Sequence, residues 1–318
     1  MDTKYLVDPE LLPALEYFPP FDLTVEMLPQ MRAMLAEGLK QRLAVASPTD
    51  VLVEERVIPG PLGAPDVRVL VFSPPSNTSS QRPGYLHMHG GGYVMGSSDD
   101  FRVQSAEIVS QMGCVVVSVE YRLAPETPHP GPVEDCYAAL KWFHANAASL
   151  GVDPSRIAIG GESAGGGLTA ALALLARDRA EVAVAFQLLI YPMLDDRTVT
   201  RSEPHAYAGE FVWGAKSNHF GWHSLLGHEP GLEGVSHYAA AARAESLAGL
   251  PPTFISVGAL DIFLDEDIDY AKRLLAAGVP TELHVYPGAY HGFDVADADV
   301  SKRFRRDALA ALKRALQA

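Results

Sequence analysis

The stretch RIAIGGESAGGG at residues 156–167 decides the fold, because a short apolar run ends there in glycines that surround a serine. The run Arg156–Ile159 indicates a buried strand, and the alanine- and leucine-rich residues Ala164–Arg177 predict a helix directly after it. Ser163 then lies at a sharp strand–turn–helix junction, where glycine stands two positions before and after it because larger side chains would collide. This context predicts a nucleophilic serine whose hydroxyl is lifted clear of a sheet.

Apolar runs alternate with helical stretches on both sides of this junction. Strands are expected at Tyr85–His89, Cys114–Val119, Arg156–Ile159, Val184–Ile190, Thr253–Val257 and Leu283–Tyr286, and helices at Phe101–Met112, Cys136–Ala148, Ala164–Arg177, Leu264–Ala277 and Arg303–Leu316. This alternation is typical of parallel βαβ units with helices on both faces of the sheet. Earlier in the chain, Val51–Ile58 and Val67–Phe72 predict two further strands joined by a Pro/Gly turn. The predicted class is α/β, with a mostly parallel central sheet flanked by helices.

A serine hydroxyl is a weak nucleophile and needs a base, which must be chosen among 11 histidines. Where serine lies on such a turn, the acid and then the histidine follow it in chain order. His291 lies in the loop after the last apolar run and is the expected base, although a surface histidine is the alternative. His284 lies inside that run, so its side chain is committed to one face of the sheet.

The acid is expected after the preceding run, Thr253–Val257. Asp261 is the first carboxylate beyond its end, and there it would orient the imidazole and stabilise its charged form. Asp265, Glu266 and Asp267 come next, but they open the expected helix Leu264–Ala277, where acidic side chains favour a helix N-terminus. Asp261 is therefore the predicted acid.

A glycine loop supplies candidate donors for a developing oxyanion. His89-Gly90-Gly91-Gly92 follows the run Tyr85–His89, and such a loop can turn backbone N–H groups toward the serine. Gly91 and Gly92 are the expected donors, together with the N–H of Ala164. His89 precedes Ser163 and ends a strand, so a supporting role in the loop is favoured over a role as base.

Five motifs in order resemble the hormone-sensitive-lipase family of esterases. They are His89-Gly90-Gly91-Gly92, the stretch from Tyr121 to Glu126, Gly161-Glu162-Ser163-Ala164-Gly165, the spacing of Asp261 to Glu266, and His291-Gly292-Phe293. The resemblance implies an α/β-hydrolase core with a helical cap, and hydrolysis of short-to-medium acyl esters through an acyl-enzyme without a metal or other cofactor. It also implies that Tyr121 to Glu126, with Glu134 and Asp135, support the site. The chain departs from the family at Gly167, where asparagine is common, and at Ile262, where proline is common.

Two segments are expected to form the cap, residues 1–48 and 194–238, while residues 49–193 and 239–318 form the catalytic core. The first contains methionines at helical spacing, read as a packing face or a cleft lining. The second has no clear strand and interrupts the α/β alternation, as a lid does. Its clustered aromatic residues are the expected substrate contacts, unless they only fill the core of the cap: Phe211, Trp213, Phe220 and Trp222.

Composition excludes several classes of partner. A net charge of −14 and a pI near 5.2 argue against nucleic acid, which requires clustered Lys and Arg. No stretch reaches the roughly 18 apolar residues of a membrane span, and the N-terminus lacks the apolar run of a secretory signal, so a cytoplasmic location is expected. The two cysteines indicate neither a disulfide framework nor a zinc site. The expected partner is a small ester substrate, and a homodimer is a further expectation.

Three functions remain distinguishable by experiment. The first is a serine carboxylesterase. The second is an amidase, deacetylase or lactonase that uses the same triad, because the shape of the pocket sets the choice of leaving group. The third is a non-catalytic small-molecule receptor, against which the presence of His291 counts. A fluorophosphonate probe separates the third from the others, since only an activated serine reacts with it.

Overall fold

The computed structural model describes residues 3–17, 21–44, 50–75 and 81–317. An eight-stranded sheet runs through the molecule in the order β1-β2-β4-β3-β5-β6-β7-β8. β2 pairs antiparallel with both β1 and β4, and the other neighbours pair parallel. The strands are β1 (Leu52–Ile58), β2 (Val67–Ser73), β3 (Arg82–Met88), β4 (Val115–Glu120), β5 (Val152–Glu162), β6 (Phe186–Ile190), β7 (Thr253–Gly258) and β8 (Thr281–Tyr286). The predicted mostly parallel sheet is confirmed.

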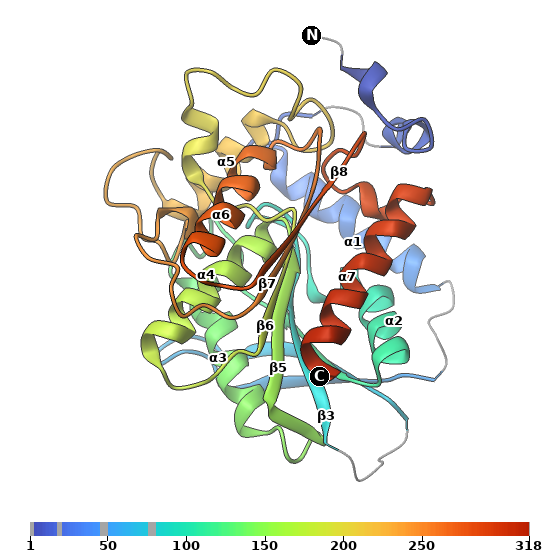
Figure 1. Ribbon diagram of the computed structural model, residues 1–318, viewed down its shortest axis with the longest axis vertical. Helices are drawn as coiled ribbons and strands as arrows, with labels where there is room; N and C mark the ends of the chain where they lie inside the picture. The colour runs from blue at the N-terminus through green and yellow to red at the C-terminus, as the bar shows by residue number, and fades with distance from the viewer. Residues whose placement is uncertain (1–2, 18–20, 45–49, 76–80, 318) are drawn as a thin grey trace.

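Helices cover both faces of this sheet. α2 and α7 lie against one face, and α3, α4 and α6 lie against the other (Figure 1). The α-helices are α1 (Leu28–Ala44), α2 (Arg102–Met112), α3 (Gly131–Ala145), α4 (Ala164–Arg179), α5 (Ala215–Leu226), α6 (Leu264–Ala276) and α7 (Asp299–Gln317). Short 3₁₀ helices are η1 (Lys4–Leu6), η2 (Leu12–Glu16), η3 (Ser98–Phe101), η4 (Asp196–Thr200), η5 (Ala241–Arg243) and η6 (Phe293–Val295).

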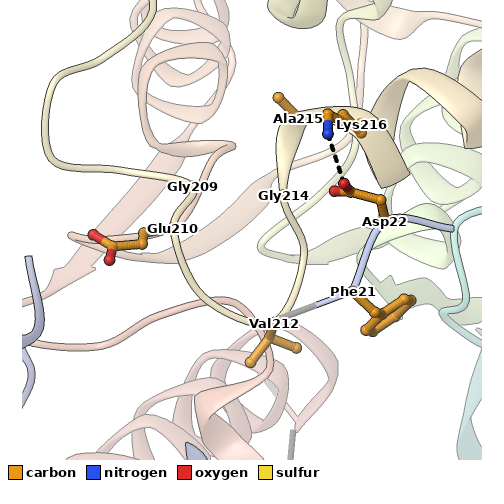
Figure 2. Close-up of a pocket in the computed structure, with 8 residues that line it drawn as sticks. All are labelled: Phe21, Asp22, Gly209, Glu210, Val212, Gly214, Ala215 and Lys216. Carbon is orange, nitrogen blue, oxygen red and sulfur yellow. Dashed lines mark hydrogen bonds and ion pairs between the residues drawn. The ribbon is translucent and has the colours of Figure 1, made fainter. Parts of the chain in front are cut away.

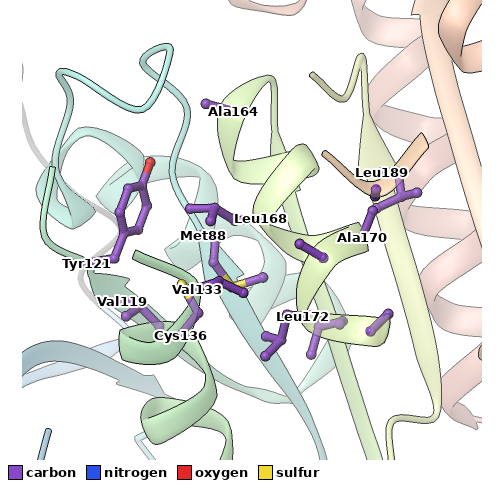
Figure 3. Packing of buried hydrophobic residues seen from close by; sticks show 14 of the residues in the cluster. Met88, Val119, Tyr121, Val133, Cys136, Ala164, Leu168, Ala170, Leu172 and Leu189 are labelled. Carbon is purple, nitrogen blue, oxygen red and sulfur yellow. The ribbon is translucent and has the colours of Figure 1, made fainter. Parts of the chain in front are cut away.

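The core lies in two layers, one on each face of the sheet. In the layer under α3 and α4, Leu168 and Leu172 pack toward Met88 of β3 (Figure 3). Each such leucine, removed from water, contributes about 2 kcal/mol. The other layer, under α2 and α7, contains Phe304 and Leu312. Both cysteines are buried and free, as small apolar side chains.

The change of strand order at β3 and β5 positions the site. β3 and β5 pair directly, with Met88 opposite Gly161, but the chain continues from β3 to β4 on one side and from β5 to β6 on the other. Connections that diverge in this way leave a crevice at the carboxyl ends of the strands, where ligands bind in open α/β sheets. The glycine loop after β3 and the serine turn after β5 therefore lie side by side.

The N-terminal residues contact the loop that carries His291. The N–H of Asp8 donates to the carbonyl of Gly288 at 3.0 Å, and the hydroxyl of Tyr290 donates to the carbonyl of Leu11 at 3.0 Å. The methionines predicted to share one face of a helix differ in burial: in α1, Met31 packs against the core whereas Met34 is exposed. The predicted packing face is therefore only partly buried.

Residues 194–238 contain η4 and α5 and no strand. Their assignment to a cap together with residues 1–48 stays a prediction, and residues 1–2, 18–20 and 45–48 of that assignment lie outside the described residues. In the part of the chain that the structure describes, no helix is both long enough and apolar enough to cross a bilayer.

Candidate active site

Ser163 occupies a strained turn between β5 and α4. Its backbone has φ 57° and ψ −119°, a conformation that costs a non-glycine residue about 1–3 kcal/mol. Two 2.9 Å hydrogen bonds hold the turn, from the N–H of Ser163 to the carbonyl of Ile190 and from the N–H of Gly167 to the carbonyl of Ser163. A Cβ on Gly161 or Gly165 would lie 2.2 or 2.1 Å from the carbonyl oxygen of Met88. Only glycine fits at both positions, as the sequence predicted.

Three side chains from separate loops meet at this turn. Nε2 of His291 lies 2.9 Å from Oγ of Ser163, and its Nδ1 lies 2.8 Å from Oδ2 of Asp261. The N–H of Phe263 donates to the other oxygen of Asp261 at 3.0 Å, which orients the carboxylate. Ser163 and His291 are 6% and 7% exposed and Asp261 is fully buried. An imidazole so placed can accept the hydroxyl proton, while the carboxylate fixes its tautomer and stabilises its charged form.

The glycine loop after β3 presents unused donors beside the serine. Gly91 and Gly92 have φ of +123° and +61°, which L side chains rarely adopt. No hydrogen bond between described residues uses the N–H of Gly91, Gly92 or Ala164. Since a Cβ on Gly90 would lie 3.5 Å from Cβ of Ser163, the loop runs beside the serine, and these N–H groups remain candidate donors to an oxyanion.

His89 supports the glycine loop from inside the protein. Its ring stacks on Tyr121 at 4.2 Å and 12°, and its Nδ1 lies 2.8 Å from the carbonyl oxygen of Gly90. The hydroxyl of Tyr121 donates to the carbonyl of His89 at 2.6 Å. Burial lowers the pKa of His89, which favours the neutral ring. These contacts favour the supporting role that we expected.

Residues 209–214, here named the roof segment, contact all three loops that surround Ser163. The N–H of Gly209 donates to the carbonyl of Leu260, next to Asp261, at 2.9 Å. Phe211 packs on Tyr290, next to His291, with ring centroids 6.0 Å apart. Trp213 lies against the glycine loop, since a Cβ on Gly92 would be 2.3 Å from its ring. The roof segment therefore contacts the loops that carry the base, the acid and the candidate oxyanion donors.

A tight turn inside the roof segment directs these two aromatic side chains. The N–H of Trp213 donates to the carbonyl of Phe211 at 2.7 Å, which closes a three-residue γ-turn around Val212. Val212 has φ 62°, an unfavourable value for a β-branched residue. The side chains of Phe211 and Trp213 are buried, while Val212 is half-buried.

A cavity of about 280 Å³ is lined in part by the roof segment (Figure 2). Val212 and Phe21 face it, as does the ion pair between Lys216 and Asp22, whose charged atoms are 2.7 Å apart. Glu210, also in its wall, accepts hydrogen bonds from the backbone and side chain of Thr3. The N-terminal residues thus hold the roof segment.

The structure separates the four aromatic residues that we expected to cluster. Phe211 packs on Tyr290 of the base loop and Trp213 lies against Gly92, so a role of these two in substrate contact stays a prediction. Phe220 lines a different cavity of about 620 Å³, together with Pro125 and Pro128. Trp222 is fully buried in the core, where its ring packs on Tyr93 at 5.3 Å. Phe220 and Trp222 lie on the helix α5, and their contacts are with Pro125 and Pro128 and with Tyr93.

Sequence reasoning missed two supports of the site. His87 bridges Ser118 at 3.0 Å and the carboxylate of Glu162 at 2.8 Å, so it holds the residue that precedes the serine. Arg32 of α1 clamps the loop after the glycines, with 2.7 and 2.9 Å bonds to Glu126 and one of 2.7 Å to the carbonyl of Val94. His87 could have been found as a polar residue within a buried strand, but no local pattern marks Arg32.

Metal ligands do not gather in the described residues. No group of three or more His, Cys, Asp or Glu residues there could hold a metal ion. On the surface of α5, His219 and His223 instead share the carboxylate of Glu229, at 2.9 and 3.2 Å.

Comparison with known proteins gives consistent results. Residues 85–295 match a family described by the alpha/beta hydrolase fold. The esterase LipI of Mycobacterium tuberculosis is 35% identical over 297 residues, which cover 92% of this chain and 89% of that protein. The carboxylesterase NlhH of the same organism is 35% identical and covers 98% and 97%. Among solved structures, a bacterial heroin esterase is 43% identical with a TM-score of 0.93, covering 99% of this chain and all of that one.

Proposed function

Because the chain belongs to the α/β-hydrolase family, as a serine carboxylesterase that resembles hormone-sensitive lipase, we propose that Ser163, His291 and Asp261 form its catalytic triad. The observation that carries the proposal is the pair of hydrogen-bond distances at the imidazole, 2.9 Å to Ser163 and 2.8 Å to Asp261. The serine, acid and histidine follow the chain order of this fold.

Acylation begins when Nε2 of His291 takes the proton of Ser163 as Oγ attacks the carbonyl carbon of the ester. Negative charge moves to the carbonyl oxygen, where the N–H groups of Gly91, Gly92 and Ala164 stabilise it. The imidazolium then gives its proton to the departing alcohol, and the acyl group stays on Ser163. Asp261 keeps its charge throughout and stabilises the imidazolium.

Deacylation repeats these roles with water. His291 takes a proton from a water molecule, the hydroxide attacks the acyl carbon, and the oxyanion again occupies the glycine loop. The carboxylic acid leaves as Ser163 regains its proton. No metal or cofactor enters this sequence of steps.

The substrates are esters with short-to-medium acyl chains, of about two to eight carbons. The contacts of the roof segment support this, because Trp213 lies against the glycine loop and Phe211 packs on the base loop, where their rings would limit the length of an acyl chain held beside Ser163. Each methylene that fits contributes about 0.8 kcal/mol, and the first that does not fit reverses the trend. The roof segment would then belong to a cap formed by residues 1–48 and 194–238.

Hydrolysis of p-nitrophenyl esters with two to sixteen carbons tests this function. Rates should rise and then fall sharply beyond about eight carbons, and they should drop by about 10⁴–10⁶ in Ser163→Ala, as for other triad serines. Matched anilides and lactones, assayed in parallel, separate an esterase from an amidase or lactonase. Faster cleavage of sixteen-carbon than four-carbon esters would contradict the closed pocket. Residual activity of a few per cent in Ser163→Ala would contradict the nucleophile.

A further inference from the structure

Tyr191 joins the nucleophile turn to the base loop, although it belongs to neither. It directly follows β6, and its N–H donates to the carbonyl of Ser256 on β7 at 2.6 Å. The residues around it bracket the nucleophile: Ile190 accepts from the N–H of Ser163, and Met193 donates to the carbonyl of Ser163, both at 2.9 Å. The backbone at Tyr191 is therefore tied to the position of Ser163.

The backbone of Tyr191 is strained to point its ring at the base. Its φ is 34°, on the left-handed side where non-glycine residues are uncommon. The ring meets that of His291 edge-on, with centroids 4.8 Å apart and planes at 68°. Phe263 contacts the same imidazole at 5.2 Å and 85°. Two aromatic rings thus limit the rotation of the His291 side chain. Strain of this kind persists where surrounding contacts over-determine a residue, often at an active site.

The hydroxyl of Tyr191 binds a carboxylate in the loop that carries His291. It donates to Oδ1 of Asp294, three residues after His291, at 2.6 Å. Burial is the main cause that raises the pKa of Asp294, and the charge of Glu162 adds to it, whereas the bond from Tyr191 and the charge of His291 lower it. The backbone carbonyl of Asp294 is also held by Arg305 of α7 at 2.6 Å.

From these contacts we propose that Tyr191 is a positioning residue, which holds the imidazole of His291 toward Ser163 and acts through the carboxylate of Asp294. The ionisable groups around the imidazole are Asp261, which binds its Nδ1, Asp294 and Tyr191, with Glu162 acting on Asp294. In its ionised form Asp294 is a second charge that favours the imidazolium formed during the reaction, just as the charge of His291 lowers the pKa of Asp294. The inference rests on the proposed triad.

The test compares Tyr191→Phe, Asp294→Asn and the double variant. Each single variant should lower kcat about tenfold, because Tyr191→Phe removes the hydrogen bond to Asp294 and Asp294→Asn replaces its carboxylate by a weaker, uncharged acceptor, with KM changed less than about twofold. Because both changes act on one contact, the losses in the double variant should be less than additive. The acid limb of the pH–rate profile should move to lower pH in Asp294→Asn, since a carboxylate near the imidazole favours its charged form. A smaller move in the same direction is expected for Tyr191→Phe.

Tyr286→Phe is the matched control. Tyr286 is also buried and also donates to an aspartate, Asp307 at 3.1 Å, and its ring contacts Phe293 at 5.5 Å, but it does not contact His291. Its kcat and pH profile should equal those of the wild type within about twofold.

Three results would overturn the inference: unchanged kcat and pH profile in Tyr191→Phe and Asp294→Asn, additive losses in the double variant, or a loss in KM alone. If Tyr191→Phe does not fold, the inference is tested by the kcat of Asp294→Asn and by the acid limb of its pH–rate profile. Activity in Ser163→Ala would instead refute the proposed function itself, so the two failures are distinguishable.

Discussion

The loops that carry Ser163, Asp261 and His291 differ from the roof segment above them in what holds them in place. The three loops follow β5, β7 and β8 directly, so the sheet sets their positions, and backbone hydrogen bonds and close glycine contacts complete the serine turn. Apart from the backbone hydrogen bond between Gly209 and Leu260, the roof segment is held mainly by side chains, such as Glu210 bonded to Thr3 and Trp213 bonded to Asn218 at 3.2 Å.

This difference separates chemistry from specificity. Changes in the loops should alter the rate for every substrate, because they act on charges and protons common to all esters. Changes in the roof segment should alter the choice of substrate, because they act on the space around the acyl chain. The predictions below test this division in order of decreasing effect.

The largest effect is expected for Asp261→Asn. An amide in place of the buried carboxylate favours the wrong tautomer of His291 and no longer stabilises its cation, so kcat should fall about 10⁴-fold. Steady-state rates with the four-carbon ester, together with a thermal melt, measure this. A loss below about tenfold in a folded variant would mean that another group serves as the acid.

Gly92→Ala should have the next largest effect. The added Cβ would meet the ring of Trp213 at 2.3 Å, and the residue would keep a φ of +61° only under strain. Movement of the loop removes one oxyanion donor, for which a loss of about 10²–10³ in kcat is expected. The loss should be equal for two- and eight-carbon esters. A loss confined to long chains would place Gly92 with the roof segment instead.

Trp213→Ala should change preference more than rate. The indole lies against the oxyanion loop, and its removal opens space for about two more methylenes. The rate ratio of the eight-carbon to the four-carbon ester should therefore rise about tenfold. Trp222→Phe is the control, since Trp222 is buried against Tyr93, and it should lower stability without changing this ratio. An unchanged ratio in Trp213→Ala would show that the indole does not line the acyl pocket.

Glu210→Gln should have the smallest effect. Its carboxylate accepts two part-buried hydrogen bonds from Thr3, and an amide oxygen retains them in weaker form, so stability should fall by less than about 1 kcal/mol. Faster hydrogen exchange is expected in residues 3–17 and 209–214, with the rate on the two-carbon ester changed less than twofold. Exchange that stays unchanged in both segments would show that this contact does not hold the roof segment.

The same difference explains what could be predicted from the sequence. The strands and helices were predictable from the alternation of apolar runs and helical stretches. The turn at Ser163 was predictable because backbone sterics admit few side chains there, and the order serine, acid, histidine along the chain selected Asp261 and His291. The separate positions of Trp213 and Trp222 were not predictable, because the conformation of the eight residues between them decides which way each ring points. Tyr191 was missed for the same reason, since its role depends on contacts with Asp294, 103 residues away.

The central claim is that Ser163 is activated by His291, and labelling with a fluorophosphonate measures this directly. Intact-mass and peptide analysis should find one label per chain in the wild type, on the peptide that contains Ser163. No label is expected in Ser163→Ala, and labelling of His291→Ala should be slower by several orders of magnitude. Labelling of another residue, or equal labelling rates with and without His291, would contradict the account.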